Sequence, residues 1–246
     1  MDIKKVRLMV NAVQHLSLAR NIETITDIVR HTARQITGAD GATFVLKDND
    51  KCYYANEDAI TPLWKGQRFP LESCVSGWTM LNKKTAIIPD IYKDERVPIE
   101  AYKPTFVKSL VMVPIRTIDP IGAIGNYWAQ PHEPSPEEIE LLQSLADITS
   151  VSIENVYAYN ELKAQNERLY EIAFLQSHQV RVPIAHILGL YNLFNFENPG
   201  DSKNSELLKR LKTSIDELDK MVKQIVDNTY SIQSQFVNPL KSLKGS

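Results

Sequence analysis

The sequence predicts an α+β protein: an antiparallel sheet flanked by helices, followed by a long helix and an antiparallel helical hairpin that forms a four-helix bundle on dimerisation. Three observations predict this fold class. Short β-rich runs alternate with helical segments before about residue 134, the later part is helical apart from one break, and its apolar residues form one stripe along each helix. Because two such helices alone would leave apolar surface in water, we expect two copies of the chain to pair.

The first part begins with two amphipathic helices and a β-hairpin. Apolar residues recur at helical spacing from residue 8 to residue 29, and Asn21 is placed to cap the second helix. The β-rich runs GATFVLKD and KCYYANED are separated by Asn49 and Asp50, which tolerate the backbone conformation of a tight turn. We therefore expect two adjacent antiparallel strands.

A short central helix and a second hairpin follow. In SCVSGWTMLN we expect Ser73 to cap a helix that ends at Asn82 and leads into the strand TAIIPD. The runs KSLVMVPI and IGAIGNYWAQ predict a hairpin across RTIDP, with Gly122 and Gly125 where other parts of the chain approach closely. The expected total is about five strands.

From residue 136 the pattern is helical. Ser135 is placed to cap a helix with carboxylates in its first turn, and no helix breaker precedes Pro183. Residues 158–176 have the alternating four- and three-residue spacing of a coiled-coil seam, weakened by two glutamines. The run NFENPGDSKNS ends this helix, and the return helix has a regular apolar stripe up to residue 232. These helices predict a hairpin.

The composition excludes several classes of protein. The formal net charge is −2, without a basic run for nucleic acid or for an anionic membrane. The apolar runs are too short to span a bilayer and the charged start is unlike a signal peptide, so we expect a cytoplasmic protein. The two cysteines, Cys52 and Cys74, have no zinc-ligand spacing, and we expect no metal site and two reduced thiols.

The stretch from about Arg7 to Tyr157, with SCVSGWTMLNKKTAIIPDIYKDERV at its centre, resembles a GAF domain. The resemblance implies a cytoplasmic sensor module that binds a cyclic nucleotide, a linear tetrapyrrole, haem or a small metabolite, or that only dimerises. Tetrapyrrole-binding members usually attach the chromophore to a cysteine close to a histidine, and no such pair stands here. We therefore expect no cofactor other than an unidentified small-molecule ligand.

The run QSHQVRVP resembles the dimerisation and phosphoacceptor hairpin of two-component sensor histidine kinases. In that family an arginine and a proline follow the phosphoacceptor histidine by three and five residues, and those positions here are His178, Arg181 and Pro183. The resemblance implies domains at 1–157 (GAF sensor), 158–176 (coiled-coil signalling helix) and 177–232 (hairpin), with a tail at 233–246. It also implies a homodimer whose partners are a response-regulator receiver domain or a partner histidine kinase.

Two departures from that family bear on activity. The acidic residue that usually follows the histidine is Gln179, which can orient an imidazole but cannot act as a base, and Val182 replaces the polar residue found in phosphatase members. The sequence has no Gly-rich phosphate loop, so we expect no autophosphorylation from ATP. The leading hypothesis is a signalling protein that exchanges phosphoryl groups at His178, and the alternative is a non-catalytic ligand-binding and dimerisation module whose hairpin only docks partners.

For the sensor part we expect a pocket between the sheet and the short central helix. Aromatic walls with a few polar groups suit a small ligand, and the residues chosen on that basis are Phe44, Trp78, Asp90, Tyr92 and Tyr102. The alternative is that the aromatic side chains only fill the core. A third hypothesis is thiol redox chemistry, as in GAF proteins that reduce methionine sulfoxide, if the fold brings Cys52 and Cys74 together.

Overall fold

The computed structural model describes residues 2–237, with side chains for all of these except 175, 176 and 228–237. The chain divides into two compact units after Glu161. The first contains α1 (Ile3–Leu18), α2 (Ile22–Thr37), β1 (Gly41–Asp48), β2 (Lys51–Ala59), β3 (Arg68–Pro70), the 3₁₀ turn η1 (Leu71–Ser73), α3 (Val75–Asn82), β4 (Ala86–Ile88), α4 (Ile99–Tyr102), β5 (Ser109–Ile115), β6 (Gly122–Trp128) and the start of α5 (Pro136–Leu193). The second contains the rest of α5 and α6 (Ser202–Val237).

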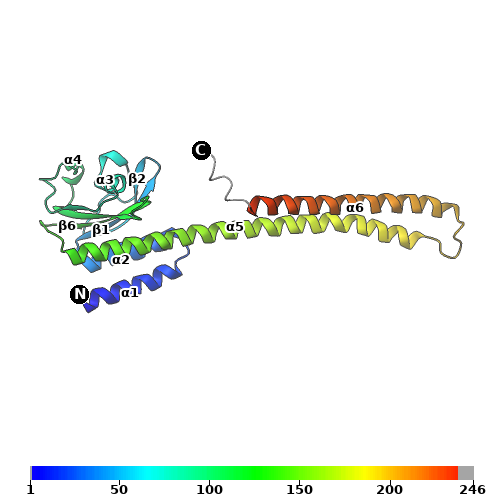
Figure 1. Cartoon of the computed structure of the whole chain (residues 1–246), viewed down its shortest axis with the longest axis horizontal. Helices are drawn as coiled ribbons and strands as arrows, with labels where there is room; N and C mark the ends of the chain where they lie inside the picture. The colour runs from blue at the N-terminus through cyan, green and yellow to red at the C-terminus, as the bar shows by residue number, and fades with distance from the viewer. Residues whose placement is uncertain (1, 238–246) are drawn as a thin grey trace. The chain divides into compact units, whose positions relative to one another are not determined.

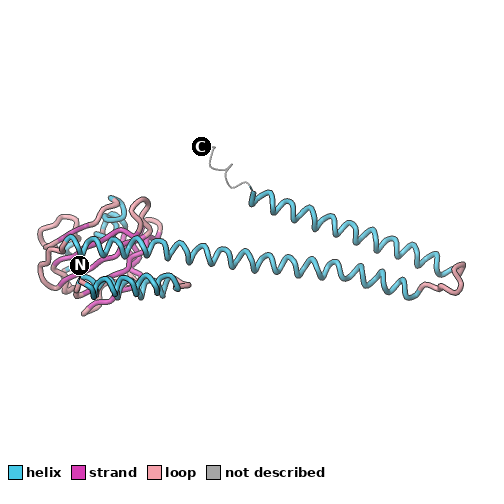
Figure 2. Tube along the Cα trace, turned by 60° about the horizontal axis from the view of Figure 1, so that its bottom comes forward, coloured by secondary structure: helices cyan, strands magenta, loops and turns pink. Residues whose placement is uncertain are grey.

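The first unit is built on one antiparallel sheet with the strand order β3-β2-β1-β6-β5-β4. Helices α1, α2 and the start of α5 cover one face, and α3 and α4 lie over the other (Figure 1). The strands cross between these two helical layers, as the second view also shows (Figure 2). The predicted antiparallel sheet flanked by helices is thereby confirmed. It has one strand more than expected, because β3 is only three residues long and follows an irregular loop.

Each face of the sheet has its own hydrophobic core. Because side chains alternate along a strand, β1 directs Phe44 toward α1, α2 and α5 and Val45 toward α3. Burying one such side chain stabilises the fold by about 1.5–3 kcal/mol. The strands β5 and β6 are buried along their whole length, as expected for a sheet covered on both sides.

Helix ends follow the sequence signals in two of three cases. The Asn21 side chain accepts a hydrogen bond from the Thr24 amide at 2.8 Å, and Ser135 and Glu138 exchange the bonds of a capping box at the start of α5. The prediction that Ser73 caps α3 is wrong: Cys74 is the N-cap residue, because Ser73 belongs to η1 and its hydroxyl donates to the Pro70 carbonyl.

Glycines stand where the chain approaches itself closely. A Cβ on Gly77 would lie 1.7 Å from the Leu71 carbonyl oxygen, and a Cβ on Gly122 would lie 2.3 Å from the Val45 carbonyl oxygen. The first contact allows α3 to pack directly on η1, and the second allows β6 to pair with β1. The predicted role of Gly122 is confirmed.

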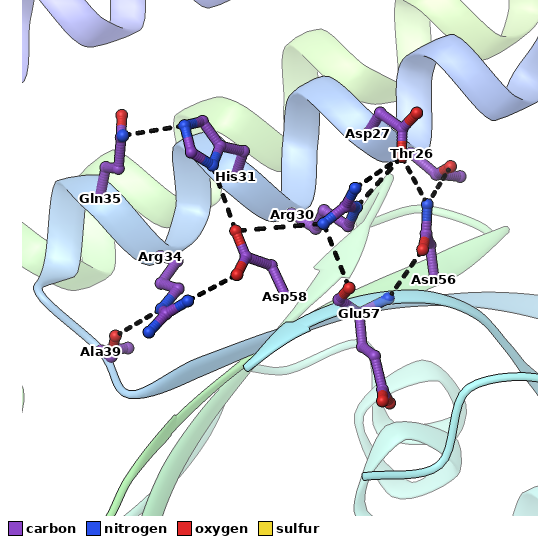
Figure 3. A network of polar contacts seen from close by, with 10 residues as sticks. All are labelled: Thr26, Asp27, Arg30, His31, Arg34, Gln35, Ala39, Asn56, Glu57 and Asp58. Atoms are coloured by element: carbon purple, nitrogen blue, oxygen red, sulfur yellow. Dashed lines mark hydrogen bonds and ion pairs between the residues drawn. The ribbon is translucent and has the colours of Figure 1, made fainter. Parts of the chain in front are cut away.

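A polar network joins α2 to β2 (Figure 3). The Arg34 guanidinium donates to Asp58 Oδ1 at 2.5 Å, and His31 Nδ1 lies 3.1 Å from Asp58 Oδ2. The Asn56 amide nitrogen, on β2, donates at 2.7 Å to Asp27, which lies one turn before His31 on α2. Since these groups bridge two elements, the network fixes the position of α2 on the sheet.

The second unit is a helical hairpin. Helix α5 continues through Pro183 to Leu193, residues 194–201 form the turn, and α6 runs back along α5 (Figures 1 and 2). The buried Asn204 side chain holds the turn, because its amide nitrogen donates to the carbonyls of Asn195 and Asn198. The predicted hairpin is present, whereas residues 238–246 of the predicted tail lie outside the described residues.

Candidate functional site

Two places in the structure have the features of a functional site, one in each unit. The first is a cavity of about 260 Å³ on the α3 and α4 side of the sheet. Its walls are four aromatic rings, one thiol, one carboxylate and small side chains between them: Tyr54, Trp64, Phe69, Ser73, Cys74, Pro98, Glu100, Ala101 and Tyr102. A neighbouring hollow of about 330 Å³ shares Trp64, Phe69 and Ala101 with it.

The aromatic walls are held in a fixed arrangement by each other. Trp64 packs edge-to-face on Tyr102 with ring centroids 4.8 Å apart, and on Tyr54 at 5.6 Å. Tyr54 in turn meets Phe69 at 5.5 Å. Such pairs are worth about 0.5–1.5 kcal/mol each beyond the area they bury. The cavity is therefore preformed.

The loop that carries Trp64 is fixed by one carboxylate. Glu57, at the end of β2, accepts hydrogen bonds from the backbone amides of Leu63, Trp64 and Lys65 at 3.0, 2.9 and 2.8 Å. Three bonds to one ionised group order a segment that has no secondary structure of its own. The indole of Trp64 is thus placed by the backbone as well as by its aromatic neighbours.

The polar groups of the cavity form a short chain. The Tyr54 hydroxyl lies 3.1 Å from Ser76 Oγ, and Ser76 Oγ lies 3.2 Å from Cys74 Sγ. Burial raises the pKa values of the Tyr54 and Tyr102 phenols well above their ordinary value, so both stay protonated at neutral pH. The site can therefore offer aromatic surface, hydroxyl groups and a thiol to a small ligand.

The residues predicted for a ligand pocket do not gather in one place. Tyr102 lines the cavity, and Trp78 is half-buried on α3 with the Arg96 guanidinium 4.6 Å above its ring. Asp90 lies on the loop after β4, where it pairs with Lys93 at 3.0 Å, and Tyr92 is mostly exposed. The Asp90 and Tyr92 side chains do not line the cavity.

Phe44 requires a correction. It was expected between the sheet and the short central helix, but it is completely buried in the other core, against α1, α2 and α5. The alternation along β1 separates Phe44 from Val45 but does not say which set faces which helical layer. Sequence reasoning also missed Tyr54, Phe69 and Trp64 as cavity walls. The available signal was the two aromatic residues within the run TPLWKGQRFP, Trp64 and Phe69.

The second place is the surface of α5 around His178. The His178, Gln179 and Arg181 side chains are exposed, and Val182 is 46% exposed. Pro183 is buried instead. The Leu175 side chain, one turn before His178 in the sequence, lies outside the described side chains. The helix thus presents an open imidazole, a guanidinium and an apolar patch within about one turn.

The seam between α5 and α6 follows a regular spacing. On α6 the least exposed side chains recur at alternating three- and four-residue intervals: Asn204, Leu207, Leu211, Ser214, Leu218, Met221 and Ile225. On α5 they are Val180, Pro183, Ile187 and Leu190, and Phe194 at the start of the turn continues the series. His178 is not in this series, so the imidazole is not used in packing the hairpin. Ile184 and Tyr191 lie outside this series and are exposed in a single chain.

No cluster of three or more His, Cys, Asp or Glu side chains that could hold a metal ion occurs within the described part of the chain. In residues 2–237, no helix combines the length and apolar character needed to cross a membrane.

Comparison with known proteins supports the fold of the first unit. A family model described as GAF domain matches residues 19–154. The GAF domain from Acinetobacter phosphoenolpyruvate-protein phosphotransferase is 17% identical with a TM-score of 0.56, and the match covers 65% of this chain and 99% of that one. The sequence matched none of the curated proteins with which it was compared.

Two further solved structures show the same likeness. The free methionine-R-sulfoxide reductase from Neisseria meningitidis, in complex with its substrate, is 16% identical with a TM-score of 0.56, covering 65% of this chain and 95% of that one. The chromophore-binding domain of a bacteriophytochrome from R. palustris is 17% identical with a TM-score of 0.56, covering 64% and 62%. At these identities the likeness is one of fold.

Proposed function

The chain belongs to the GAF domain family, whose members serve as sensor domains in signalling proteins, and from this premise we propose a cytoplasmic, dimeric signalling protein that accepts a phosphoryl group on His178. In this proposal the first unit senses a signal and the hairpin exchanges phosphoryl groups with a partner. The partner is a response-regulator receiver domain or a separate histidine kinase.

The observation that carries the proposal is the exposure of His178 beside a buried Pro183. Transfer to an imidazole requires an open path along which the phosphorus can approach the ring nitrogen in line with its leaving group. The exposed Arg181, three residues further along the same helix, can stabilise the charge on the equatorial oxygens. Val182 adds apolar surface that a docking domain would cover.

Dimerisation follows from the apolar surface that one hairpin leaves uncovered. On α6, Leu208, Ile215 and Val222 are about half exposed and recur every seven residues. On α5, Ile184, Leu188 and Tyr191 form a similar exposed row. A second copy of the hairpin would bury both rows in a four-helix bundle and leave His178 outside the core.

Phosphoramidate tests the acceptor without knowledge of the partner. The imidazole nitrogen attacks phosphorus, the phosphorus–nitrogen bond of the reagent breaks, ammonia leaves, and the imidazole N–H proton passes to water. We expect acid-labile phosphate on His178 of the full-chain protein, measured by mass spectrometry at neutral pH. His186, exposed two turns further along α5, is the internal control, and His178→Gln is the matched variant.

The second half of the test is transfer onward. The labelled protein is mixed with receiver domains encoded in the same genome, and we expect at least one receiver to remove the label faster than water does. Labelling of His178 no faster than His186, together with no receiver that accepts the label, would contradict the proposal. Loss of the dimer in Ile215→Glu, measured by light scattering, tests the bundle separately.

A second candidate function is supported by the preformed cavity. GAF domains can bind small molecules, and a space of about 260 Å³ with aromatic walls fits a small, largely apolar ligand. In that case the hairpin only dimerises and docks partners. Native mass spectrometry of the protein as purified would detect a retained ligand, and Ala101→Trp, which fills the cavity, should abolish the extra mass.

A further inference from the structure

We propose that Cys52 and Cys74 are a dithiol that peroxides oxidise to an intramolecular disulfide at the wall of the cavity. The two residues lie 22 positions apart in the sequence, on β2 and at the N-cap of α3. The proposal does not depend on phosphoryl transfer at His178, which is in the other unit.

The fold brings the two thiols together through β3. In the sheet, Cys52 is the register partner of Phe69, and the neighbouring Lys51 is the register partner of Pro70. The chain then turns through η1, and Cys74 Sγ returns to within 3.5 Å of the Pro70 carbonyl oxygen. Cys52 is completely buried, and both thiols belong to the core on the α3 side of the sheet.

The surroundings make the two thiols unequal. A hydrogen bond from the Cys52 thiol is the largest effect that lowers the pKa of Cys74, which falls to about 7 despite burial, with help from the Ser76 hydroxyl and the amides of Gly77 and Ser76. The same hydrogen bond and burial raise the pKa of Cys52 far above its ordinary value. At neutral pH, Cys74 is therefore the nucleophile and Cys52 keeps its proton.

The hydrogen-bond chain can hold a thiolate at Cys74 once the thiol gives up the long bond that it donates to the Pro70 carbonyl at 3.5 Å. A thiolate has no proton to donate, so the Ser76 hydroxyl, 3.2 Å away, must donate to it. Ser76 then accepts from the Tyr54 hydroxyl at 3.1 Å, and burial keeps that phenol protonated.

Cys74, the thiol with the lower pKa, is also the more accessible of the two. Cys74 lines the cavity of about 260 Å³, whereas Cys52 does not and has no exposed surface. A molecule as small as hydrogen peroxide can occupy such a space. The reagent therefore meets Cys74 first, and Cys52 acts only from within the protein.

The reaction proceeds in two balanced steps. The Cys74 thiolate attacks one peroxide oxygen, the O–O bond breaks, and sulfur is oxidised to a sulfenic acid. The leaving hydroxide takes up the proton that Cys74 released to solvent on ionising and becomes the first water. Because the neutral sulfenic acid no longer accepts a hydrogen bond as a thiolate does, Cys52 loses the main cause of its raised pKa. Cys52 sulfur then attacks Cys74 sulfur, the S–O bond breaks, and the Cys52 proton leaves with the hydroxyl group as water.

The product changes the cavity wall. A covalent bond would tie β2 to the N-terminus of α3, and Cys74 would lose the thiolate that Ser76 and Cys52 now stabilise. The net reaction consumes one peroxide and two thiols and yields one disulfide and two waters. A thiol reductant reverses it by exchange.

The test uses the full chain, which contains two cysteines. Treatment with hydrogen peroxide should remove both titratable thiols, lower the mass by two hydrogens, and yield a peptide pair joining residues 52 and 74 after digestion. Dithiothreitol should restore both thiols. A non-reducing gel distinguishes this product from a disulfide between chains.

Two matched variants separate the roles of the sulfurs. Cys52→Ser should leave Cys74 as a sulfenic acid that dimedone traps, whereas Cys74→Ser should leave Cys52 unmodified by peroxide and by iodoacetamide. In Cys52→Ser and in the wild type, the rate of Cys74 alkylation should rise with pH as the thiol ionises. The midpoint of this rise should lie near pH 7 in the wild type. Tryptophan fluorescence confirms that each variant is folded. Two free thiols after peroxide, a bond only between chains, or faster reaction at Cys52 would each overturn the proposal.

Discussion

Replacement of Asp58 by asparagine tests the network that fixes α2 on the sheet (Figure 3). The Asp58 carboxylate accepts a hydrogen bond from the Arg34 guanidinium at 2.5 Å, and its other oxygen lies 3.1 Å from His31 Nδ1. The side chain of Asp58 is 18% exposed and that of Arg34 is 30% exposed, so solvent screens this ion pair only in part. The Asp58→Asn side chain keeps the shape and one acceptor oxygen but loses the charge.

The size of the effect follows from these contacts. A hydrogen bond to a charged partner contributes about 1.5–3 kcal/mol when both groups are buried. His31 is 62% exposed, so its share is small, and most of the effect comes from Arg34. We therefore expect Asp58→Asn to lower the free energy of unfolding by about 1–2 kcal/mol at neutral pH.

The three tryptophans provide an assay specific to the first unit. Trp64, Trp78 and Trp128 all lie within residues 1–161, so tryptophan fluorescence during urea unfolding of the full chain reports on that unit alone. The matched control is Asp119→Asn, because Asp119 pairs with Arg116 at 3.0 Å but is 74% exposed. This control should change the stability by less than about 0.5 kcal/mol.

The difference between wild type and Asp58→Asn should also depend on pH. Burial raises the pKa of the Asp58 carboxyl, but the hydrogen bonds from His31 and Arg34 outweigh burial and hold the pKa below its ordinary value. The stabilisation is therefore complete above the unfolded pKa of about 3.9 and is lost as the pH falls through the lower folded value. A stability difference that persists below that value, or a variant as stable as wild type at neutral pH, would refute the assignment.

Three further substitutions test the packing around the cavity and the hairpin. Gly77→Ala should cost about 3 kcal/mol or more, since its Cβ would lie 1.7 Å from the Leu71 carbonyl oxygen, and the same fluorescence assay measures it. Glu57→Gln should cost about 1–2 kcal/mol and speed hydrogen exchange at residues 63–65, because the amide group cannot accept all three backbone bonds. Pro183→Ala should slow hydrogen exchange in the surrounding helix about tenfold, because a helix-propensity gain of about 3 kcal/mol exceeds the loss of about 1.6 kcal/mol for two buried methylene groups. Faster exchange near residue 183 would show that the proline is not a local weak point.

The sequence signals that the structure confirms are local ones. The caps at Asn21 and Ser135 were predictable because capping depends on residues within one turn. The hairpin of β1 and β2 was predictable for the same reason, and Asn49 adopts the left-handed conformation that its turn requires. Such signals do not depend on the rest of the fold.

The features that the sequence did not predict depend on contacts between separate elements of the chain. Ser73 was a reasonable cap by composition, but the packing of η1 on the sheet moved the helix start by one residue. The pairing of β3 with β2 takes only three residues and has no periodic signal. The cavity could not be predicted from its residues, because Trp64 is positioned by Glu57 from another element and Cys74 is brought to Cys52 by the antiparallel pairing of β3 with β2.

The arrangement of β6 shows how the cavity and the helical layer are joined. Tyr127 faces the cavity side, where its hydroxyl lies 2.9 Å from Thr43 Oγ1 and its ring packs on Trp64 at 5.7 Å. The preceding residue, Asn126, faces the opposite layer and donates to the Ala33 carbonyl of α2 at 2.7 Å. Tyr127, which contacts the cavity wall, and Asn126, which is hydrogen-bonded to α2, are therefore adjacent residues of one fully buried strand, so the positions of the cavity wall and of α2 are both fixed by β6.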